Sequence, residues 1–209
     1  MTVEQIGALF TDADGAYRFA RWERPIVPVV FGVQEETLAV VKGACEAVVA
    51  LAGHKMAETD PEMGANLMVF FFRDWRELLA VPDLGGLVPG LEGLVARLDA
   101  EGARQYRVFR FEPSGAIRAC VVFLRMDAAM QEVPADELAL AQMAQAILLW
   151  SNSAFRARSP LARATNGQVI LRPEIADVIR ASYDPVMPAV ARDASHALRL
   201  AARMPARDG

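Results

Sequence analysis

Apolar residues recur at intervals of three and four along Glu35–Gly53, which predicts an amphipathic helix with Gly53 as its C-cap. A similar stripe predicts a second helix over Leu91–Glu101. The segment Leu67–Phe72 is apolar without alternation, which is typical of a strand covered on both faces. Asp74, shortly after this strand, can cap a short helix that extends to Leu79.

Two further segments have the character of strands. Ile26–Phe31 is β-branched and aromatic, and the prolines in and beside it predict a strand at a sheet edge, because proline lacks a backbone donor. Gln105–Phe111 and Ala116–Leu124 flank a Pro/Gly turn at 112–115, which predicts a hairpin. Alternation along its second strand predicts a common face for the residues Ile117, Ala119, Val121 and Phe123.

The C-terminal third is predicted to be mainly helical. Ala135–Trp150 is apolar nearly all round, which indicates a buried helix, and its central Gln142 and Gln145 would then need hydrogen-bond partners. A polar connection, Asn152–Gly167, leads to a short strand, Val169–Leu171. Pro173 can open the next helix. The last predicted helix is Pro188–Met204, and its inward residues would be Val190, Ala194, Leu198 and Ala201.

This order of elements predicts an α+β fold in which helices pack mainly on one face of a mixed sheet. The 209 residues suit a single domain, 1–209, with a C-terminal helical segment at 173–204. Hydrophobic residues make up 54% of the chain and charged residues 23%, so a sizeable core can form.

Charge and apolar runs exclude several classes of function. A formal net charge of −4 gives no overall attraction to nucleic acid. The apolar runs are far shorter than the roughly 18–20 residues that span a bilayer, and Met1–Gln5 has no secretory-signal character. We therefore expect a cytoplasmic protein that acts on neither nucleic acid nor membranes.

Candidate chemistry is sparse. Asp12–Gly15 is interpreted as a turn, because the ligands of a calcium loop are missing at the other positions. His54 and His196 are interpreted as exposed side chains, and the two distant cysteines, Cys45 and Cys120, as buried thiols. No nucleophile motif or phosphate-binding loop is present. We expect no metal, no cofactor and no catalytic residue.

The most prominent polar feature is a basic group in the connection after the buried helix. Arg156, Arg158 and Arg163 occur there without an acidic neighbour, and Arg172 follows closely. Guanidinium groups that converge can bind an anion or an acidic protein. The alternative interpretation is a solvated run of charge. The three arginines of the connection are the predicted contact residues for a partner or an anionic ligand.

Several stretches resemble a bacterial family catalogued as domain of unknown function 2927. The main one is Val169–Pro185, with its strand, turn and helix that end in Tyr183-Asp184-Pro185. Further stretches similar to the family are Arg21–Val27, Ala65–Val69, Ala144–Ile147 and Ser153–Phe155. The family's helix around Ala144–Ile147 resembles an altered zinc-protease helix, so the resemblance implies a zincin-like fold. Family members also tend to be exported, whereas this chain shows no signal.

A working zinc-protease helix needs His-Glu-x-x-His, because residues four apart place both imidazoles on one face. The matching positions here, Leu140–Gln145, hold no such ligand and no general base. The leading hypothesis is therefore a non-catalytic, degenerate zincin-like domain that binds a protein or another ligand. One alternative is a hydrolase of unrecognised type with carboxylates from Glu58, Asp60 and Glu62. Another is a small-molecule carrier with a closed apolar cavity. The sequence leaves the oligomeric state open.

Overall fold

A four-stranded mixed sheet lies at the centre of the computed structural model, which describes residues 1–205. Its order is β2 (Pro28–Phe31), β3 (Leu67–Phe72), β5 (Ile117–Arg125) and β4 (Gln105–Phe111). The first three strands are parallel, and β4 is antiparallel to β5. The predictions of a mixed sheet in an α+β fold, of an edge strand at the proline-containing segment and of a 105–124 hairpin are confirmed.

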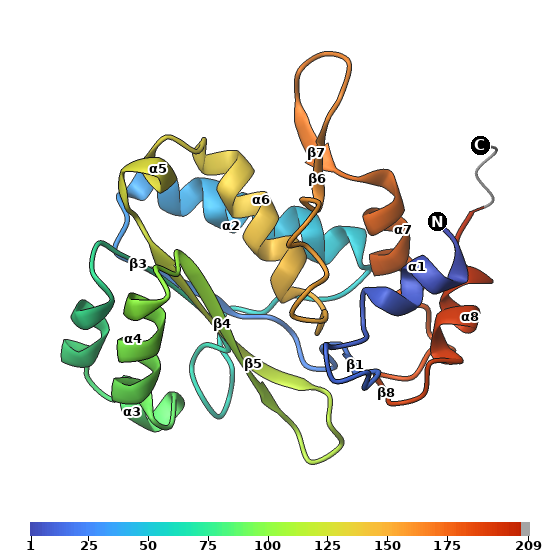
Figure 1. Cartoon of the computed structure of the whole chain (residues 1–209), viewed down its shortest axis with the longest axis horizontal. Helices are drawn as coiled ribbons and strands as arrows, with labels where there is room; N and C mark the ends of the chain where they lie inside the picture. The colour runs from blue at the N-terminus through green and yellow to red at the C-terminus, as the bar shows by residue number, and fades with distance from the viewer. Residues whose placement is uncertain (206–209) are drawn as a thin grey trace.

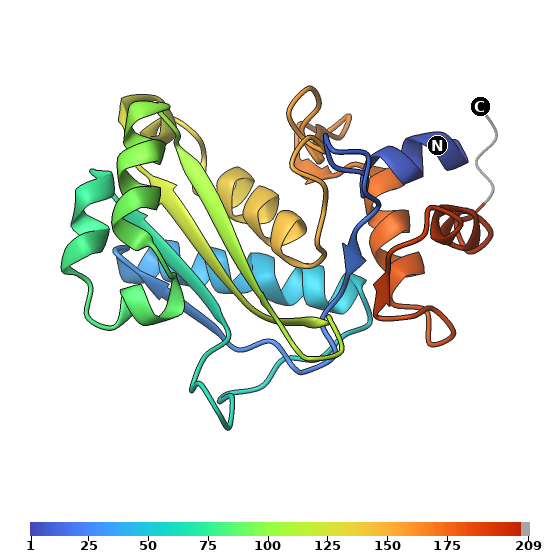
Figure 2. The same ribbon diagram turned by 60° about the horizontal axis from the view of Figure 1, so that its bottom comes forward.

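Helices cover both faces of this sheet, as Figures 1 and 2 show, so the prediction that they pack mainly on one face is wrong. The reason is that β3 and β5 carry apolar side chains on both faces, and each face must be covered. The two longest helices, α2 (Glu35–Leu51) and α6 (Ala135–Ala146), pack together on one face. The other face is covered by the shorter η1 (Trp75–Ala80), α3 (Leu84–Leu87) and α4 (Leu91–Ala100). Strand β3 contributes Val69 to the first layer and Phe70 to the second, so it is buried on both faces as predicted. A short helix, α5 (Ala128–Gln131), precedes α6.

One prediction of alternation along β5 is wrong. Val121 and Phe123 face the layer of η1 and α4, whereas Ile117 packs in the core on the α2 side. The cause is a β-bulge: Arg110 pairs with Ala119 but Phe111 pairs with Ile117, so one additional residue lies on β5. A bulge of one residue reverses the faces beyond it, because side chains alternate with a period of two.

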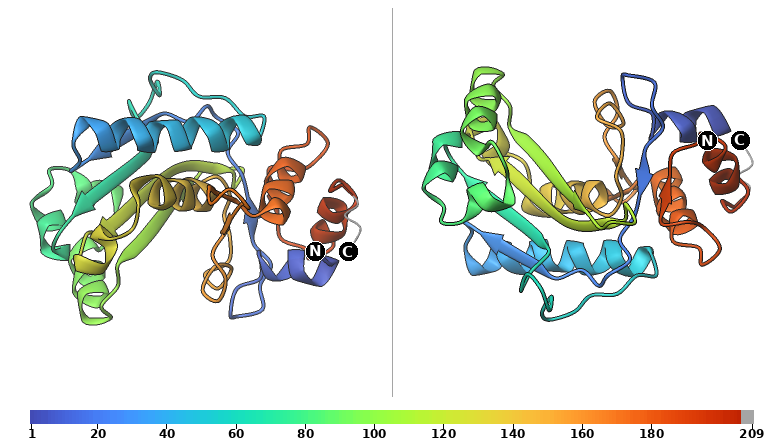
Figure 3. Two further views of the ribbon diagram at one scale, coloured as in Figure 1. Left: turned by 90° about the horizontal axis from the view of Figure 1, so that it is seen from above. Right: turned by 90° about the horizontal axis from the view of Figure 1, so that it is seen from below.

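The N- and C-terminal segments form a second group of elements beside the sheet (Figure 3). It contains α1 (Val3–Ala8), β1 (Phe19–Ala20), α7 (Pro173–Ser182), β8 (Val190–Ala191) and α8 (His196–Ala201). Strand β1 pairs antiparallel with β8, and α1 packs against α8. The apolar residues of this group, such as Ile6 and Leu200, belong to the same core cluster as the α2 face of the sheet.

The last helix is shorter than predicted. Val190 and Ala191 pair with β1 instead of joining a helix, and the helix itself begins only at His196. Leu198, predicted to face inward, is 58% exposed. Pairing with a strand that is distant in the sequence has overridden the local period of apolar residues here.

His196 is buried, so its interpretation as an exposed side chain is wrong. Its side chain is 3% exposed, and Nδ1 lies 2.8 Å from the hydroxyl of Tyr17. The imidazole also packs against Phe19, with ring centroids 4.3 Å apart. The histidine is thus part of the contact between α8 and the N-terminal segment.

Helix α6 ends at Ala146, four residues before the predicted end, and its C-terminus is buried. The last carbonyl groups of a helix have no partner within the helix and must find one elsewhere. Three aromatic side chains supply these partners. The indole of Trp150 donates to Ala144 O at 2.9 Å, that of Trp22 to Ala146 O at 2.9 Å, and the hydroxyl of Tyr183 to Ile147 O at 2.9 Å.

The connection predicted over 152–167 is only partly irregular. It contains β6 (Leu161–Arg163), which pairs with β7 (Val169–Leu171) in a second hairpin. This hairpin projects beyond α6 and α7 at the top of Figure 1. The predicted strand at 169–171 and the predicted helix that Pro173 opens are both confirmed.

The bond from Tyr183 to the end of α6 can be tested by replacing Tyr183 with Phe. The ring stays in place, but the carbonyl oxygen of Ile147 loses its donor and the N–H of Trp22 loses its acceptor, which together cost at least about 1–3 kcal/mol. We expect the free energy of unfolding, measured with urea, to fall by this amount. Tyr106→Phe is a suitable control, since that hydroxyl has no hydrogen-bond partner among residues 1–205, and an equal loss in both variants would contradict the assignment.

Stability is also expected to depend on pH through His196. Burial, with a contribution from Arg199, lowers the pKa of this imidazole to about 4, against about 6.5 in an unfolded chain. Between these values the unfolded chain binds the proton and the folded chain does not. The contribution of the neutral ring is therefore complete above about pH 6.5 and is lost as the pH falls toward 4.

Urea denaturation at several pH values should detect this loss. In His196→Phe the free energy of unfolding should fall less steeply between pH 6.5 and 4 than in the unchanged protein. Burial also lowers the pKa of His54, so His54→Gln measures the separate part that this group contributes. A slope unchanged in His196→Phe would refute the role of His196.

Candidate functional site

The connection that carries the predicted arginines follows α6 in the sequence, and its first residues lie against the C-terminal end of α1. Ser151 donates its backbone N–H to Leu9 O at 2.7 Å and its hydroxyl to Ala8 O at 3.2 Å. The N–H of Asn152 is bonded to the carboxylate of Asp12 at 3.1 Å. These contacts fix the first residues of the connection against the N-terminal segment.

An aromatic stack extends this anchoring into the connection. The ring of Trp150 stacks on Phe10 with centroids 5.2 Å apart, and Phe155 meets Trp150 edge-on at 5.1 Å. Such pairs hold their rings in defined orientations. The loop around Phe155 is therefore held beside α1, although the two segments are far apart in the sequence.

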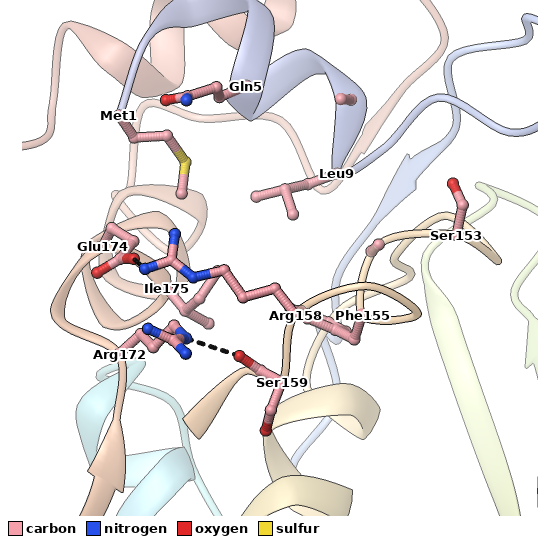
Figure 4. A pocket seen from close by; sticks show the side chains of 12 residues that line it. Met1, Gln5, Leu9, Ser153, Phe155, Arg158, Ser159, Arg172, Glu174 and Ile175 are labelled. Atoms are coloured by element: carbon pink, nitrogen blue, oxygen red, sulfur yellow. Dashed lines mark hydrogen bonds and ion pairs between the residues drawn. The ribbon is translucent and has the colours of Figure 1, made fainter. Parts of the chain in front are cut away.

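A pocket of about 490 Å³ lies between α1, this loop and the start of α7 (Figure 4). One side is apolar and the other is polar. The apolar lining residues are Met1, Ala8, Leu9, Ala154, Phe155 and Ile175. The polar lining residues are Gln5, Ser153, Arg158, Ser159, Arg172 and Glu174. The volume falls within the usual range for small-molecule sites, roughly 300–1,000 Å³.

Two arginines meet at this pocket (Figure 4). Arg158, whose side chain is 65% exposed, pairs with the carboxylate of Glu174 at 3.1 Å. Arg172 is half-buried, and its Nε donates to Ser159 O at 2.8 Å. Within residues 1–205, the two terminal nitrogens of Arg172 have no hydrogen-bond partner. Arg172 is thus held by one bond while its forked end remains available.

The structure separates the other predicted contact residues from this pocket. Arg156 is exposed and donates through Nε to Asn152 O at 3.0 Å. Arg163 lies on β6, where it pairs with Glu137 of α6 at 3.0 Å. Of the three predicted arginines, only Arg158 lines the pocket, and Arg172 joins it.

The two glutamines of α6 differ in their surroundings. Gln142 is 2% exposed, accepts a bond from Arg107 at 3.0 Å and donates to Gln105 at 2.8 Å. Gln145 is only half-buried, and its amide donates back to Ala141 O at 3.0 Å. Sequence reasoning missed Arg107, because nothing in its strand marks it as different from an exposed arginine.

Asp60, one of the three carboxylates considered for a hydrolase, is held in the fold by hydrogen bonds. Asp60 is 4% exposed and accepts bonds from the backbone of Glu62 and Met63 and from the side chains of Arg24 and Asn66. Burial raises the pKa of this carboxyl, but the bonds outweigh burial and lower the pKa to about 2. A carboxyl with so low a pKa is a poor general acid or base near neutral pH.

The other two carboxylates of this segment are exposed. Glu62 pairs with Arg118 at 2.7 Å and with Arg24 at 3.5 Å, and Glu58 lies on the surface. Arg24 pairs in addition with Glu112. The segment is therefore a network of ion pairs that ties the 58–64 loop to the hairpin turn.

The structure also places the residues considered for metal binding or nucleophilic chemistry. His54 is half-buried, contrary to its interpretation as exposed, and its Nε2 lies 2.9 Å from Arg24 O. Both cysteines are buried, as predicted, and burial raises the pKa of each thiol to about 12. In the part of the chain that the structure describes, no three His, Cys, Asp or Glu side chains gather as metal ligands would.

Two further hollows lie elsewhere in the part of the chain that the structure describes. A groove of about 1,090 Å³ lies at the carboxyl ends of β2, β3 and β5, but Glu77 and Glu132 line it alongside a single cation, Arg73. A void between α2, β3 and α6 measures only about 10 Å³. This void is too small for a ligand and barely reaches the size of one water molecule.

Comparison with known proteins found no matching family model, no matching curated protein and no matching solved structure. The resemblance to domain of unknown function 2927 therefore remains a prediction from the sequence. Across residues 1–205, every helix is too short or too polar to cross a lipid bilayer.

The structural role of Asp60 can be tested by Asp60→Asn. The change leaves Arg24 without one of its buried partners, and we expect the free energy of unfolding to fall by about 2–4 kcal/mol.

Because the folded pKa of Asp60 is lowered, its contribution is present above about pH 4 and is lost as the pH falls toward 2. Glu62→Gln, on an exposed pair, should change stability by no more than ~1 kcal/mol. Equal effects of the two substitutions would contradict this account.

Proposed function

We propose that this protein is a non-catalytic binding domain whose pocket between α1 and α7 takes a small anionic ligand with an apolar body. The observation that carries the proposal is Arg172, whose terminal nitrogens have no hydrogen-bond partner within residues 1–205 and lie at the edge of a largely apolar pocket. The proposal keeps Arg158 from the predicted contact residues and adds Arg172. It also keeps the expectation of a cytoplasmic protein.

The division of the pocket favours an amphiphilic ligand. Leu9, Phe155 and Ile175 offer apolar surface to a hydrocarbon group, which gains free energy by leaving water. The polar side offers the fork of Arg172, whose planar geometry matches two oxygens of a carboxylate or phosphate. A ligand with both properties would satisfy both sides at once.

Charge at the polar side also favours an anion. Two arginines face one carboxylate there, so one positive charge is left over. Glu174 forms an ion pair with Arg158. Within residues 1–205, no ion pair joins Glu174 to Arg172. An incoming carboxylate would bind Arg172 first and then compete with Glu174 for Arg158.

The hydrolase alternative has less support. Its three carboxylates are divided between a buried, fully bonded Asp60 and two exposed groups, Glu58 and Glu62. None of them lines the pocket between α1 and α7. The bonds of Asp60 to Arg24 and Asn66, and the ion pairs of Glu62, hold these two carboxylates in structural contacts.

Titration calorimetry with octanoate and 1-octanol tests the proposal, because the two probes share an apolar body and differ in charge. We expect octanoate to bind more tightly than the alcohol. In a double variant, Arg158→Gln with Arg172→Gln, the affinity for octanoate should fall by about 10- to 100-fold, the effect of losing charge-assisted bonds. The affinity for 1-octanol should change little.

Matched controls come from the same connection. Arg156→Gln and Arg163→Gln remove the same charge at exposed positions outside the pocket, so they should leave octanoate binding within about twofold. A loss of binding in these controls would favour a diffuse basic surface. Equal binding of octanoate and 1-octanol, or no binding of either, would refute the proposed function.

A further inference from the structure

Strand β4 is the last strand of the sheet, and within residues 1–205 no strand pairs with its outer edge. Cys120 of β5 gives its N–H to Asn66 O at 2.9 Å, on the side away from β4. Its partner across the pair, Phe109, therefore directs its own N–H away from β5, because bonded and non-bonded pairs alternate in an antiparallel ladder. The same alternation turns the backbone groups of Gln105 and Arg107 outward. No backbone group of residues 1–205 bonds to these outward groups.

The side chains on the α6 side of this edge form a short row. In order along the strand they are Gln105, Arg107, Phe109 and Phe111. The rings of Phe109 and Phe111 stack with centroids 6.4 Å apart, and Phe111 is 44% exposed. The edge thus offers one cation and an aromatic surface on the same face. Figure 1 shows β4 at the front of the sheet beside α6.

Arg107 is a cation without an anionic partner. It is half-buried, and its Nη2 donates to the amide oxygens of Gln142 at 3.0 Å and of Gln105 at 3.5 Å. Its Nε is buried and has no hydrogen-bond partner. Within residues 1–205 no carboxylate forms an ion pair with it, and burial lowers the pKa of its guanidinium to about 10. Buried charges are normally paired, because desolvation without a partner is costly.

We propose that the outer edge of β4 binds an extended, acidic segment of a partner protein by strand addition, with a carboxylate of that segment paired to Arg107. The backbone groups of Gln105, Arg107 and Phe109 supply the ladder of hydrogen bonds. Apolar side chains of the segment, two residues from its carboxylate, pack on Phe109. This edge is separate from the pocket between α1 and α7, and the inference does not depend on the function of that pocket.

A second copy of this chain is a poor occupant of the same edge. Strand β4 contains Arg107 and Arg110 and no acidic residue. Two copies paired through this strand would bring like charges together, which destabilises cross-strand pairs. An acidic segment gives the opposite result, because its charge complements that of the strand.

The experiment uses three blocked peptides and the full-length protein labelled with ¹⁵N. The first peptide, Thr-Val-Thr-Glu-Thr-Val-Thr, places Glu between two Val residues on one face. The second replaces Glu with Gln, and the third keeps Glu but carries N-methyl groups on alternate residues, which prevents strand pairing. NMR titration gives both the dissociation constants and the positions of the perturbed amides.

We expect the Glu peptide to bind at least about tenfold more tightly than the Gln peptide, the order of effect of one charge-assisted bond. Perturbed amides should centre on Gln105, Arg107 and Phe109. The N-methylated peptide should not bind. In Arg107→Gln the preference for Glu over Gln should disappear.

Two further variants separate pairing from folding. Gln142→Glu places a carboxylate of this chain beside Nη2 of Arg107, so it should abolish the preference for the Glu peptide without unfolding the protein. Arg110→Gln removes a charge from the same strand on the other face, where Arg110 reaches Leu87 O, and should leave the preference unchanged. Equal affinity for the Glu and Gln peptides, perturbations away from β4, or no binding of any peptide would overturn the proposal.

Discussion

The buried C-terminal end of α6 is the constraint on which the rest of the structure depends. Carbonyl oxygens at this end cannot reach water, so each needs a donor from elsewhere in the chain. Trp22, Trp150 and Tyr183 supply these donors from three segments that lie before, after and far beyond the helix. One local requirement for hydrogen bonds thus fixes the N-terminal segment, the loop after α6 and α7 relative to the central sheet. The backbone N–H of Trp22 also bonds to the hydroxyl of Tyr183 at 3.3 Å, so the donors are connected to one another.

The pocket between α1 and α7 follows from the same arrangement. The chain passes from Trp150 directly into the loop that carries Phe155 and Arg158, and α7 carries Tyr183 at its end and Glu174 at its start. Trp22, Ala146 and Tyr183 meet beside this loop at the end of α6. Asn66 makes a similar contact before β3, where its side chain accepts a bond from the N–H of Val27 at 2.8 Å.

Local patterns predicted the elements whose partners are close in the sequence. The period of apolar residues located α2 and α4, the unbroken apolar run located β3, and the Pro/Gly turn located the β4–β5 hairpin. Sequence reasoning failed where distant pairing decides the conformation, as at β8 and in the burial of His196 against Tyr17. Of the candidate site, it found Arg158 and noted Arg172, but it could not place α1 opposite them. It also gave no sign of Arg107, because burial without an ion pair is a property of the folded surroundings and not of the residue type.

The reactivity of the two buried cysteines reports on local opening of the core. Cys45 on α2 and Cys120 on β5 belong to the same core cluster, and neither thiol can meet a reagent in the closed structure. Thiolates react and thiols hardly do, so each must become both exposed and ionised before alkylation. Their reaction rates in native buffer would thus measure how often the helical layer lifts from the sheet, which local opening allows well below the free energy of global unfolding. A difference between the two rates would distinguish fraying of one helix from separation of the whole layer.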